Sequence, residues 1–377
     1  MPPKQVMISV GEPSGDLHAA RLLAVLNQRN NAPDCFGMGG ARMRQQGFNA
    51  IVGIEQMAVM GLVEIIRHFP MLYGVLQQMR TLLKVRKPDL LILVDYPGFN
   101  LLLAKTAKQL GIPVLYYISP KIWVWRESRI HKIAKRVDHM ALIFPFEQPY
   151  YDRVGVPATY VGHPLVGEVS CEESVETARK QLGLDPNRRT VGLFPGSRRG
   201  EVTTLLPELL ESARQLTQQD PEVQFLLSQA PELPNSLFES AETFNGQLYR
   251  IKGDAHRAIH ACDAIVTASG TVTLEIALLN RPMVVVYRMA PLSYAILSRL
   301  IKTRWVSLVN IVAQREVVPE LLQEQASATA ILQQLQPLLE QSSQQTEMLQ
   351  GLEQVRTALG EGDSSARLAS LVEEMIV

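Results

Sequence analysis

The chain has 377 residues, 46% of them hydrophobic, and its 37 Lys and Arg balance its 37 Asp and Glu. This length is enough for two domains of ordinary size, and the zero net charge argues against a nucleic-acid-binding protein, which normally carries a basic excess. The three cysteines, Cys35, Cys171 and Cys262, are widely spaced, so no disulfide framework is predicted. The opening MPPKQVMISVGEPSGD predicts a strand rather than a signal peptide, and a reducing cytoplasm fits both observations.

In chain order, the first half alternates short apolar runs with helical stretches. The runs VMISV, CFGMG, LLILVD, VLYYIS, HMALIF and ATYVG are typical of buried strands, and LHAARLLAVLNQR, NLLLAKTAKQLG and ESRIHKIAKR are typical of the helices between them. This alternation predicts a parallel sheet that is covered by helices on both faces.

The segment 57–79, MAVMGLVEIIRHFPMLYGVLQQM, is unusually apolar, and its only full charges are Glu64 and Arg67. We expect no membrane-spanning helix, because no uncharged apolar run reaches about 18 residues. The segment fits a core helix broken at Pro70, and it also fits an apolar surface that lies on lipid or holds a hydrophobic substrate. The residues alone leave both interpretations open.

A polar, turn-rich stretch at 162–185 interrupts the alternation, which then resumes with TVGLF, VQFLLS, LYRIK, AIVTA and PMVVVY. We therefore predict an α/β fold of two Rossmann-like, doubly wound domains that face each other across a cleft. The predicted domains are an N-terminal domain, 1–163, and a C-terminal domain, 164–340. A helical segment, 341–377, is expected to pack back on the first domain.

The motif FPGSRRGE (194–201) lies between an apolar strand and a long helix. Gly196 permits a tight turn, and the free N–H groups of a helix N-terminus suit a phosphate. Arg198 and Arg199 add positive charge, and one arginine–phosphate contact contributes about 1.5–3 kcal/mol. The pattern is not a GxxxxGK(S/T) loop, but it predicts an anion site; the alternative is a plain turn with solvated arginines.

A second loop of the same type is TASGTVTLE (267–275). Ser269, Gly270 and Thr271 form a turn of small residues that opens a helix, and Glu275 follows one helical turn after Thr271. A carboxylate at this position could accept hydrogen bonds from two ribose hydroxyls. The alternative is an N-terminal cap followed by an exposed glutamate.

The corresponding loop of the first half is GEPSGD (11–16), which carries Glu12, Ser14 and Asp16 instead of arginines. Carboxylates repel phosphate and suit hydroxyl groups, so this loop predicts that the first domain binds a sugar or another hydroxyl-bearing acceptor rather than a phosphate. The alternative is simple helix capping by Ser14 or Asp16.

VDYPGFN (94–100) places Asp95 at the carboxyl end of the apolar run LLILV, where open α/β sheets carry functional residues. A partly desolvated carboxylate there can have a raised pKa and act as a general base; the alternative is that Asp95 caps the following turn. No DxD motif occurs, and His256 and His260 lack the glutamate of HExxH, so we expect neither a metal ion nor another cofactor.

Taken together, these segments closely resemble the lipid-A-disaccharide synthase family. The motifs that follow the family in order and spacing, from residue 6 to about 325, are GEPSGD, AVMGLVE, VDYPGFN, ISPKIWVWR, FPFE, GHP, PGSRRGE, SGTVTLE, MVVVYRM and VSLVNIVAQREVVPELLQ. The sequence departs from the family pattern at two positions. Gly98 replaces a second aspartate of the family motif, and Val309 replaces a proline.

The resemblance implies a GT-B-type fold and an inverting, metal-independent hexosyltransferase. Its substrates would be UDP-2,3-diacylglucosamine and 2,3-diacylglucosamine 1-phosphate, and its products the β-1,6-linked lipid A disaccharide 1-phosphate and UDP. The family works at the cytoplasmic face of the inner membrane as a peripheral protein, it has no nucleic-acid partner, and it is compatible with a homodimer.

The resemblance also assigns roles to individual residues. It implies that Asp95 is catalytic and that Glu12, Ser14 and Asp16 form the acceptor-side loop. The acylated substrates favour a lipid-facing role for segment 57–79, with Val63, Ile65, Ile66, Phe69, Leu72 and Tyr73 as the membrane- or acyl-facing residues. The implied donor-binding residues are Ser197, Arg198, Ser269, Gly270, Thr271, Glu275 and Asn310.

Three other functions are alternatives to this interpretation, and each would differ from it in one feature. A peptidoglycan N-acetylglucosaminyltransferase would carry GGxGGH-type loops, which GEPSGD does not match. A UDP-N-acetylglucosamine 2-epimerase needs no surface for acyl chains. A nucleotide-sugar sensor without catalytic activity would form no product.

Overall fold

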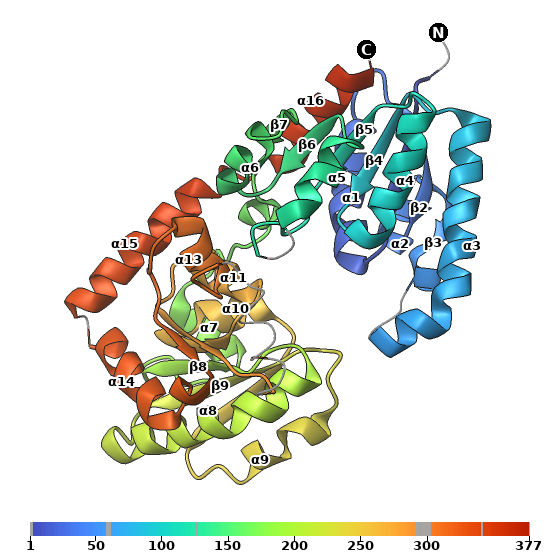
Figure 1. Cartoon of the computed structure of the whole chain (residues 1–377). Helices are drawn as coiled ribbons and strands as arrows, with labels where there is room; N and C mark the ends of the chain where they lie inside the picture. The colour runs from blue at the N-terminus through green and yellow to red at the C-terminus, as the bar shows by residue number, and fades with distance from the viewer. Residues whose placement is uncertain are drawn as a thin grey trace. The chain divides into compact units, whose positions relative to one another are not determined.

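The computed structural model describes residues 3–57, 62–124, 127–290, 294, 303–340 and 342–376, and the side chains of residues 56–69 lie outside that description. The chain divides into two compact units, one of Met1–Pro164 with Glu361–Val377 and the other of Leu165–Gly360. Each unit is built on one parallel sheet with helices on both faces (Figure 1).

The first unit contains a seven-stranded sheet in the order β3-β2-β1-β4-β5-β6-β7. All of its pairs are parallel, and Val10 at the end of β1 lies opposite Val94 at the end of β4. The residues that follow these two strands therefore leave the sheet side by side. The strands are β1 (Gln5–Val10), β2 (Asp34–Gly39), β3 (Asn49–Gly53), β4 (Leu90–Val94), β5 (Val114–Tyr117), β6 (His139–Leu142) and β7 (Ala158–Tyr160).

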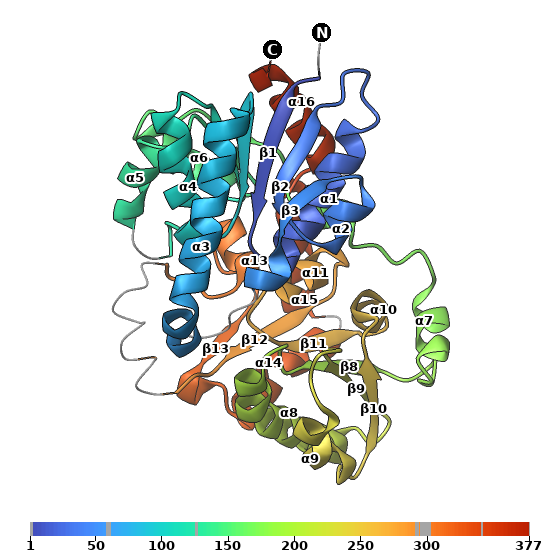
Figure 2. The ribbon, with the colours of Figure 1, turned by 90° about the vertical axis from the view of Figure 1, so that its right-hand side faces the viewer.

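The helices of the first unit cover both faces of this sheet, which explains why every residue of β4 is apolar and buried. In Figure 2, α3 and α4 lie on one side of the strands, and α1 with α16 on the other. The helices are α1 (Pro13–Leu26), α2 (Ala41–Gln45), α3 (Leu62–Arg86), α4 (Pro97–Gln109), α5 (Ile130–Ala134), α6 (Gln148–Asp152) and α16 (Ser364–Ile376), with 3-10 turns at Ile54–Met57, Glu127–Arg129, Pro145–Glu147 and Pro164–Gly167.

Helix α3 contains residues 62–79 of the apolar segment that was interpreted in two ways. Pro70 lies inside this helix and does not end it, so the expected break is wrong. Leu72 packs against the core of the sheet, whereas the Tyr73 side chain is 52% exposed. The other four expected lipid-facing side chains lie outside the described residues: Val63, Ile65, Ile66 and Phe69.

The second unit contains a six-stranded parallel sheet in the order β10-β9-β8-β11-β12-β13. Phe194 at the end of β8 lies opposite Thr267, one residue before the end of β11. The strands are β8 (Thr190–Phe194), β9 (Gln224–Gln229), β10 (Gln247–Lys252), β11 (Ala264–Ala268), β12 (Met283–Tyr287) and β13 (Glu320–Leu322).

Helices also lie on both faces of the second sheet, with α8 and α14 packed together on one of them. The long helix α8 starts directly after the PGSR loop and buries an apolar stripe that includes Leu205, Leu209 and Leu216. The helices are α7 (Val175–Gln181), α8 (Arg199–Gln219), α9 (Glu239–Glu242), α10 (Ala255–His260), α11 (Val272–Leu278), α13 (Leu308–Ala313), α14 (Ala328–Leu339) and α15 (Ser343–Ala358), with 3-10 turns at Asn235–Phe238 and Gln323–Gln325.

The segment after residue 340, which we expected as one helical segment, forms two helices that belong to different units. Helix α15 belongs to the second unit, where Met348 of this helix is buried. Helix α16, red in Figure 1, lies beside α1 in the first unit, where Leu368 and Val372 are buried and Glu373 pairs with Arg29 at 3.9 Å.

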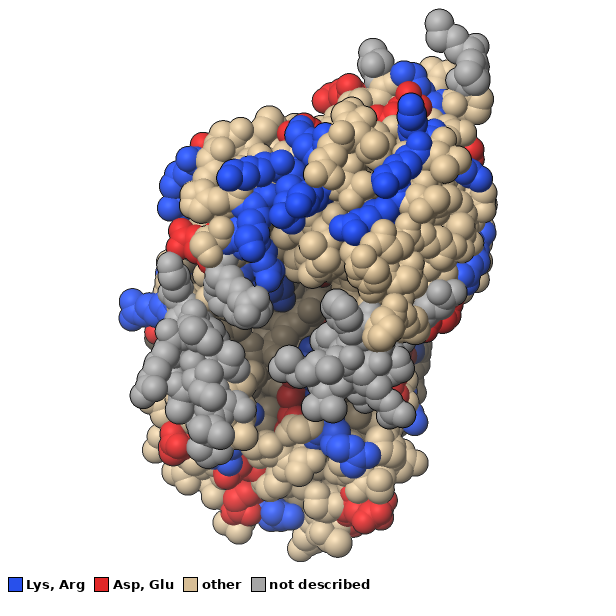
Figure 3. Space-filling model, turned by 45° about the vertical axis from the view of Figure 1, so that its right-hand side comes forward, with Lys and Arg blue, Asp and Glu red and all other residues tan. Residues whose placement is uncertain are grey.

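Lys and Arg outnumber Asp and Glu in the part of the first unit that contains α3, α4 and α5. Residues 62–136, which include α3, α4 and α5, contain 13 Lys and Arg but 4 Asp and Glu, although the whole chain is neutral. Figure 3 shows basic patches on one face of this unit. The exposed basic side chains are Lys84, Arg86 and Lys87 of α3 and its end, Lys105 and Lys108 of α4, and Lys132 and Lys135 in and after α5.

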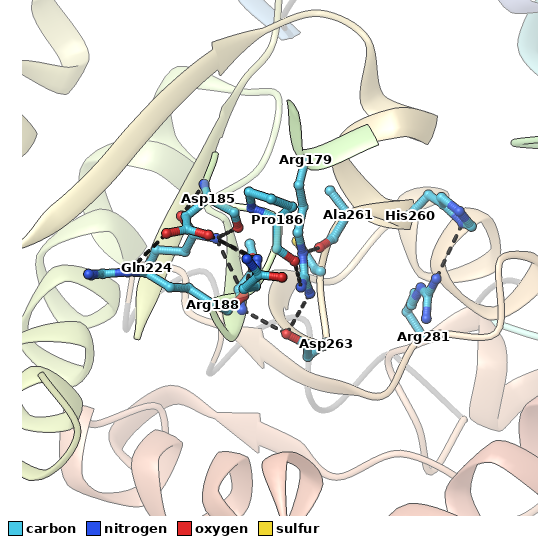
Figure 4. A network of polar contacts seen from close by, with 12 residues as sticks. Arg179, Asp185, Pro186, Arg188, Gln224, His260, Ala261, Asp263 and Arg281 are labelled. Atoms are coloured by element: carbon cyan, nitrogen blue, oxygen red, sulfur yellow. Dashed lines mark hydrogen bonds and ion pairs between the residues drawn. The ribbon is translucent and has the colours of Figure 1, made fainter. Parts of the chain in front are cut away.

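A partly buried polar network holds the amino ends of β8 and β11 together in the second unit (Figure 4). The Asp263 carboxylate accepts hydrogen bonds from the Arg179 guanidinium and from the main-chain N–H of Thr190, both at 2.7 Å. Arg179 Nε also donates to the Ala261 carbonyl at 2.9 Å. The network lies at the amino ends of the strands, opposite the edge where such sheets bind ligands, so its role is structural.

Candidate active site

The first candidate site lies where the strand order of the first sheet reverses, between β1 and β4. Chain connections run to opposite sides of the sheet at this point and leave a crevice beyond the carboxyl ends of the strands. Glu12 follows β1 and Asp95 follows β4 at this edge. A side chain at Gly11 would overlap the ring of Tyr96, so the two loops pack closely only because this residue is glycine.

Asp95 lies in a strained turn between β4 and α4. Its φ is 46° and that of Tyr96 is 49°, so two consecutive residues other than glycine have left-handed backbone. Each such residue costs about 1–2 kcal/mol, and strain of this kind is concentrated at functional sites. Burial raises the pKa of the Asp95 carboxyl, although a hydrogen bond from the Tyr96 main chain and the charge of Lys121 lower it.

Glu12 shares this environment with Asp95. Partial burial and the negative charge of Asp95 raise the pKa of Glu12, and the Lys121 ammonium lowers it. Lys121 follows β5, the neighbour of β4, and it was not among the predicted site residues. Two carboxyls with raised pKa values and one cation thus meet at this edge, which is a suitable arrangement for binding hydroxyls and removing a proton.

The two remaining residues of the GEPSGD loop have different environments. Ser14 is exposed, whereas Asp16 is buried and accepts three main-chain hydrogen bonds, from Gly40 at 2.7 Å, Arg42 at 3.1 Å and Met43 at 3.3 Å. Asp16 therefore caps the N-terminus of α2 and holds α1 against it. Both of its oxygens are engaged in the fold, so contact with the acceptor stays a prediction for this residue.

The second candidate site lies at the corresponding point of the second sheet, between β8 and β11. Gly196 in the first loop has a φ of 107°, which a residue with a side chain rarely adopts. Glu201 Oε2 accepts hydrogen bonds from the main-chain N–H groups of Ser197 at 3.1 Å and Arg198 at 3.2 Å. The turn therefore already binds a carboxylate at the N-terminus of α8, as expected for an anion site.

The Arg198 side chain is 83% exposed and lies 3.4 Å from the Glu201 carboxylate. It is thus available to an anionic ligand at low reorganisation cost. Tyr287, at the end of β12, lies close enough to Glu201 and Arg198 to be affected by their charges. Burial and the charge of Glu201 raise the pKa of its phenol, and Arg198 lowers it. The sequence motif MVVVYRM had marked this segment without indicating that Tyr287 faces the loop.

The SGT loop after β11 completes this edge. Gly270 and Thr271 lie at the surface, and a Cβ at Gly270 would meet no atom within 4 Å. Ser269 Oγ donates to the Val306 carbonyl at 2.8 Å, which ties the loop to the segment before α13. Glu275 lies 3.9 Å from His256, and burial raises the pKa of its carboxyl while that histidine lowers it.

Asn310 is completely buried, and its amide is fully used within the second unit. Nδ2 donates to the Val318 carbonyl and to Glu320, both at 2.9 Å. Oδ1 accepts from the main-chain N–H groups of Val317 at 2.7 Å and Val318 at 3.0 Å. In this conformation the amide has no exposed atom to offer a ligand, so its contact with the donor stays a prediction.

Known proteins with similar sequences identify the family. The sequence pattern of the family described as lipid-A-disaccharide synthetase matches residues 6–374. The chain is 45% identical to a lipid-A-disaccharide synthase of Geobacter metallireducens, over 100% of this chain and 98% of that protein. It is 42% identical to one of Nitrosococcus oceani, over 98% of this chain and 96% of that protein. The chain belongs to the lipid-A-disaccharide synthase family.

Solved structures agree with the two-sheet architecture. A UDP-GlcNAc 2-epimerase from Neisseria meningitidis, bound to UDP-GlcNAc, has a TM-score of 0.67 at 12% identity, covering 98% of this chain and 100% of that one. The calicheamicin glycosyltransferase CalG4 has a TM-score of 0.64 at 12% identity, covering 100% of this chain and 98% of that one. At such low identity these similarities show the fold alone.

These comparisons confirm the predicted family, the α/β fold of two Rossmann-like parallel sheets, and the glycosyltransferase class. A lipid-A-disaccharide synthase acts on sugar-nucleotide and lipid-linked substrates. No group of three or more His, Cys, Asp or Glu side chains that could hold a metal ion occurs among the described residues.

Proposed function

We propose that this chain transfers the diacylated glucosamine of UDP-2,3-diacylglucosamine to the 6-hydroxyl of 2,3-diacylglucosamine 1-phosphate. The products are the β-1,6-linked disaccharide 1-phosphate and UDP. Family membership over residues 6–374 supports this choice of substrates. The position of Asp95, in a strained turn at the reversal point of the first sheet, is the observation that carries the chemistry.

In this proposal Asp95 is the general base. Its carboxylate takes the proton of the acceptor 6-hydroxyl while that oxygen attacks C1 of the donor sugar, and the bond from C1 to the UDP oxygen breaks with inversion. The raised pKa of Asp95 makes it a stronger base than an exposed aspartate. Glu12 and Ser14 then bind acceptor hydroxyls at the same edge of the sheet.

The leaving UDP carries negative charge, which the second unit stabilises. Arg198 and the N-terminus of the 21-residue helix α8 supply the positive potential, as a metal ion does in other transferases. In this proposal the two loops that bind the diphosphate and uridine contribute Ser197, Ser269, Gly270 and Thr271. In this proposal Glu275 accepts hydrogen bonds from the ribose hydroxyls, and Asn310 is a further donor-binding residue.

Substitution of Asp95 by Asn tests the role of this residue. A general base contributes about 100- to 10,000-fold to the rate, so turnover of Asp95→Asn should fall by at least about 100-fold. UDP should bind to the variant with wild-type affinity, because the diphosphate is held on the other unit. Near-normal turnover in this variant would remove Asp95 from the mechanism.

The basic face of the first unit supports a peripheral contact with the inner membrane. Within the described part of the chain no helix is long and apolar enough to cross a bilayer. The exposed lysines of α4 and α5 would lie against anionic lipid, where each contributes about 1 kcal/mol. Met71 and Tyr73 on α3 and Leu102 on α4 add exposed apolar surface to the same unit. Both substrates carry acyl chains, so this contact would deliver them to the enzyme.

A further inference from the structure

The main-chain carbonyl of Asp95 is bound by two buried side chains from other parts of the first unit. Asn100 Nδ2 donates to this oxygen at 2.7 Å, and the Tyr116 hydroxyl donates to it at 2.6 Å. Both Asn100 and Tyr116 are completely buried. Two donors on a single carbonyl fix the orientation of the peptide group that follows the proposed catalytic residue.

Asn100 is itself held in place by the strands on either side of the reversal point. Its Oδ1 accepts a hydrogen bond from Ser9 Oγ at 2.8 Å, and Nδ2 also lies 3.4 Å from the Ser9 carbonyl and 3.2 Å from that of Val94. Ser9 belongs to β1, Val94 to β4 and Tyr116 to β5. Three neighbouring strands therefore cooperate in fixing one peptide group.

The conformation of the turn explains why such support is needed. Asp95 and Tyr96 both have positive φ, and neither is a glycine. A turn of this kind persists only where surrounding structure compensates for its strain. The Asp95 main-chain N–H donates to the Tyr117 carbonyl at 3.0 Å, so both the N–H and the carbonyl of this residue are hydrogen-bonded. These bonds restrict the direction in which its side chain leaves the edge of the sheet.

The geometry points to Asn100 and Tyr116 as positioning residues for the transfer reaction, because they hold the main chain of Asp95 so that its carboxylate meets the acceptor hydroxyl. This inference rests on the proposed role of Asp95 as the general base. Their hydrogen bonds reach the main chain of Asp95 and not its carboxylate. The two residues therefore determine the orientation of the Asp95 side chain and leave the pKa of its carboxylate unchanged.

Replacing Tyr116 by Phe provides the sharpest test, because it removes one donor and keeps the ring. Tyr151→Phe is a matched control, since Tyr151 is also completely buried and its hydroxyl makes a 2.6 Å hydrogen bond, but to Ser119 Oγ. We expect kcat of Tyr116→Phe to fall about 10-fold with KM for both substrates nearly unchanged, because small misplacements of a catalytic group are costly. Tyr151→Phe should keep kcat within about two-fold at a similar loss of thermal stability.

Asn100→Ala gives a second measurement in the same direction. It removes the anchor of the turn, and kcat should fall about 100-fold. The acid limb of the kcat/KM profile against pH should stay at the same pH in Tyr116→Phe, because the carboxylate keeps its surroundings. If Asn100→Ala does not fold, Tyr116→Phe and its control still decide the question.

The outcomes separate this inference from the proposed function. If Asp95→Asn is inactive and Tyr116→Phe loses no more turnover than Tyr151→Phe, the two residues only stabilise the fold and the inference fails alone. A shift of the acid limb in Tyr116→Phe would also overturn it, since the variant would then have changed the base itself. If Asp95→Asn turns over at nearly the wild-type rate, the role of Asp95 and the inference fail together.

Discussion

Oε2 of Glu201 lies 3.1 Å from the main-chain nitrogen of Ser197, so the N-terminus of α8 holds a carboxylate of its own chain. The neighbouring N–H of Arg198 binds the same oxygen. These are the groups that a helix N-terminus offers to a phosphate. The turn is therefore already shaped for an anion, and a diphosphate that binds there, as we propose, must either displace Glu201 or bind beside its negative charge.

The first prediction follows from that charge. Glu201→Gln keeps an oxygen that can accept from Ser197 and Arg198 but removes the negative charge, so UDP should bind about five-fold more tightly. Isothermal titration with UDP measures this directly. Glu211→Gln is the control, because Glu211 is an exposed residue farther along α8 that pairs with Arg214. Weaker binding by Glu201→Gln would mean that its carboxylate supports the ligand.

The second prediction concerns the two adjacent arginines. Arg198→Ala should weaken UDP binding by about 10- to 100-fold, which corresponds to the loss of one charge-assisted contact of about 1.5–3 kcal/mol. Arg199→Ala should have a much smaller effect, although it removes the same charge one residue later. Equal losses in the two variants would show that only the net charge of the loop matters.

The third prediction concerns Glu147, which is buried beside Trp123 and accepts a hydrogen bond from its indole nitrogen at 3.2 Å. Burial raises the pKa of Glu147 from 4.5 to about 8, which outweighs the opposing effect of its hydrogen bonds. Between these two pH values the unfolded chain ionises this group while the folded chain keeps it neutral. Its contribution to stability is therefore present below pH 4.5 and is lost as the pH rises towards 8.

Glu147→Gln keeps an acceptor for Trp123 and cannot ionise. The free energy of unfolding of this variant, relative to wild type, should rise with pH between 5 and 8 by up to about 1.4 kcal/mol per pH unit. Urea unfolding at several pH values measures the difference. A constant difference across this range would show that Glu147 titrates normally in the folded protein.

The fourth prediction concerns the basic face of the first unit. Charge reversal of Lys105 and Lys132 to Glu should lower the affinity for vesicles of phosphatidylglycerol at least about 10-fold, because each residue near an anionic surface contributes about 1 kcal/mol. Binding to neutral phosphatidylcholine vesicles should change little. Reversal of Lys180 and Lys252, which are exposed on the second unit, is the control. Equal losses in the two double variants would exclude this face as the membrane contact.

Much of the fold could be predicted from local sequence. Runs such as LLILV are apolar without alternation because both faces of their sheets are buried, and the loops that follow β1, β4, β8 and β11 carry the polar and glycine residues of the candidate site. The continuation of α3 through Pro70 could not be predicted, because packing against the sheet can outweigh the local effect of a proline.

The contacts that organise the site could not be predicted from the sequence, because the residues that make them are distant along the chain. Asn100 lies in a motif that was recognised, but its anchor is Ser9, 91 positions earlier. Asp16 was expected to bind the acceptor, which stays a prediction, and the structure shows that it caps α2 through residues 24 to 27 positions later. Sequence patterns identify residue types at an edge, whereas only the folded chain shows which of their atoms are already engaged.

The most direct test of the central claim is the reaction of the purified wild-type chain with UDP-2,3-diacylglucosamine and 2,3-diacylglucosamine 1-phosphate, followed by mass spectrometry and NMR of the lipid product. We predict one β-1,6-linked tetraacyl disaccharide 1-phosphate for each UDP released. Recovery of both sugars unchanged, or of an epimerised UDP-sugar without a disaccharide, would contradict the account.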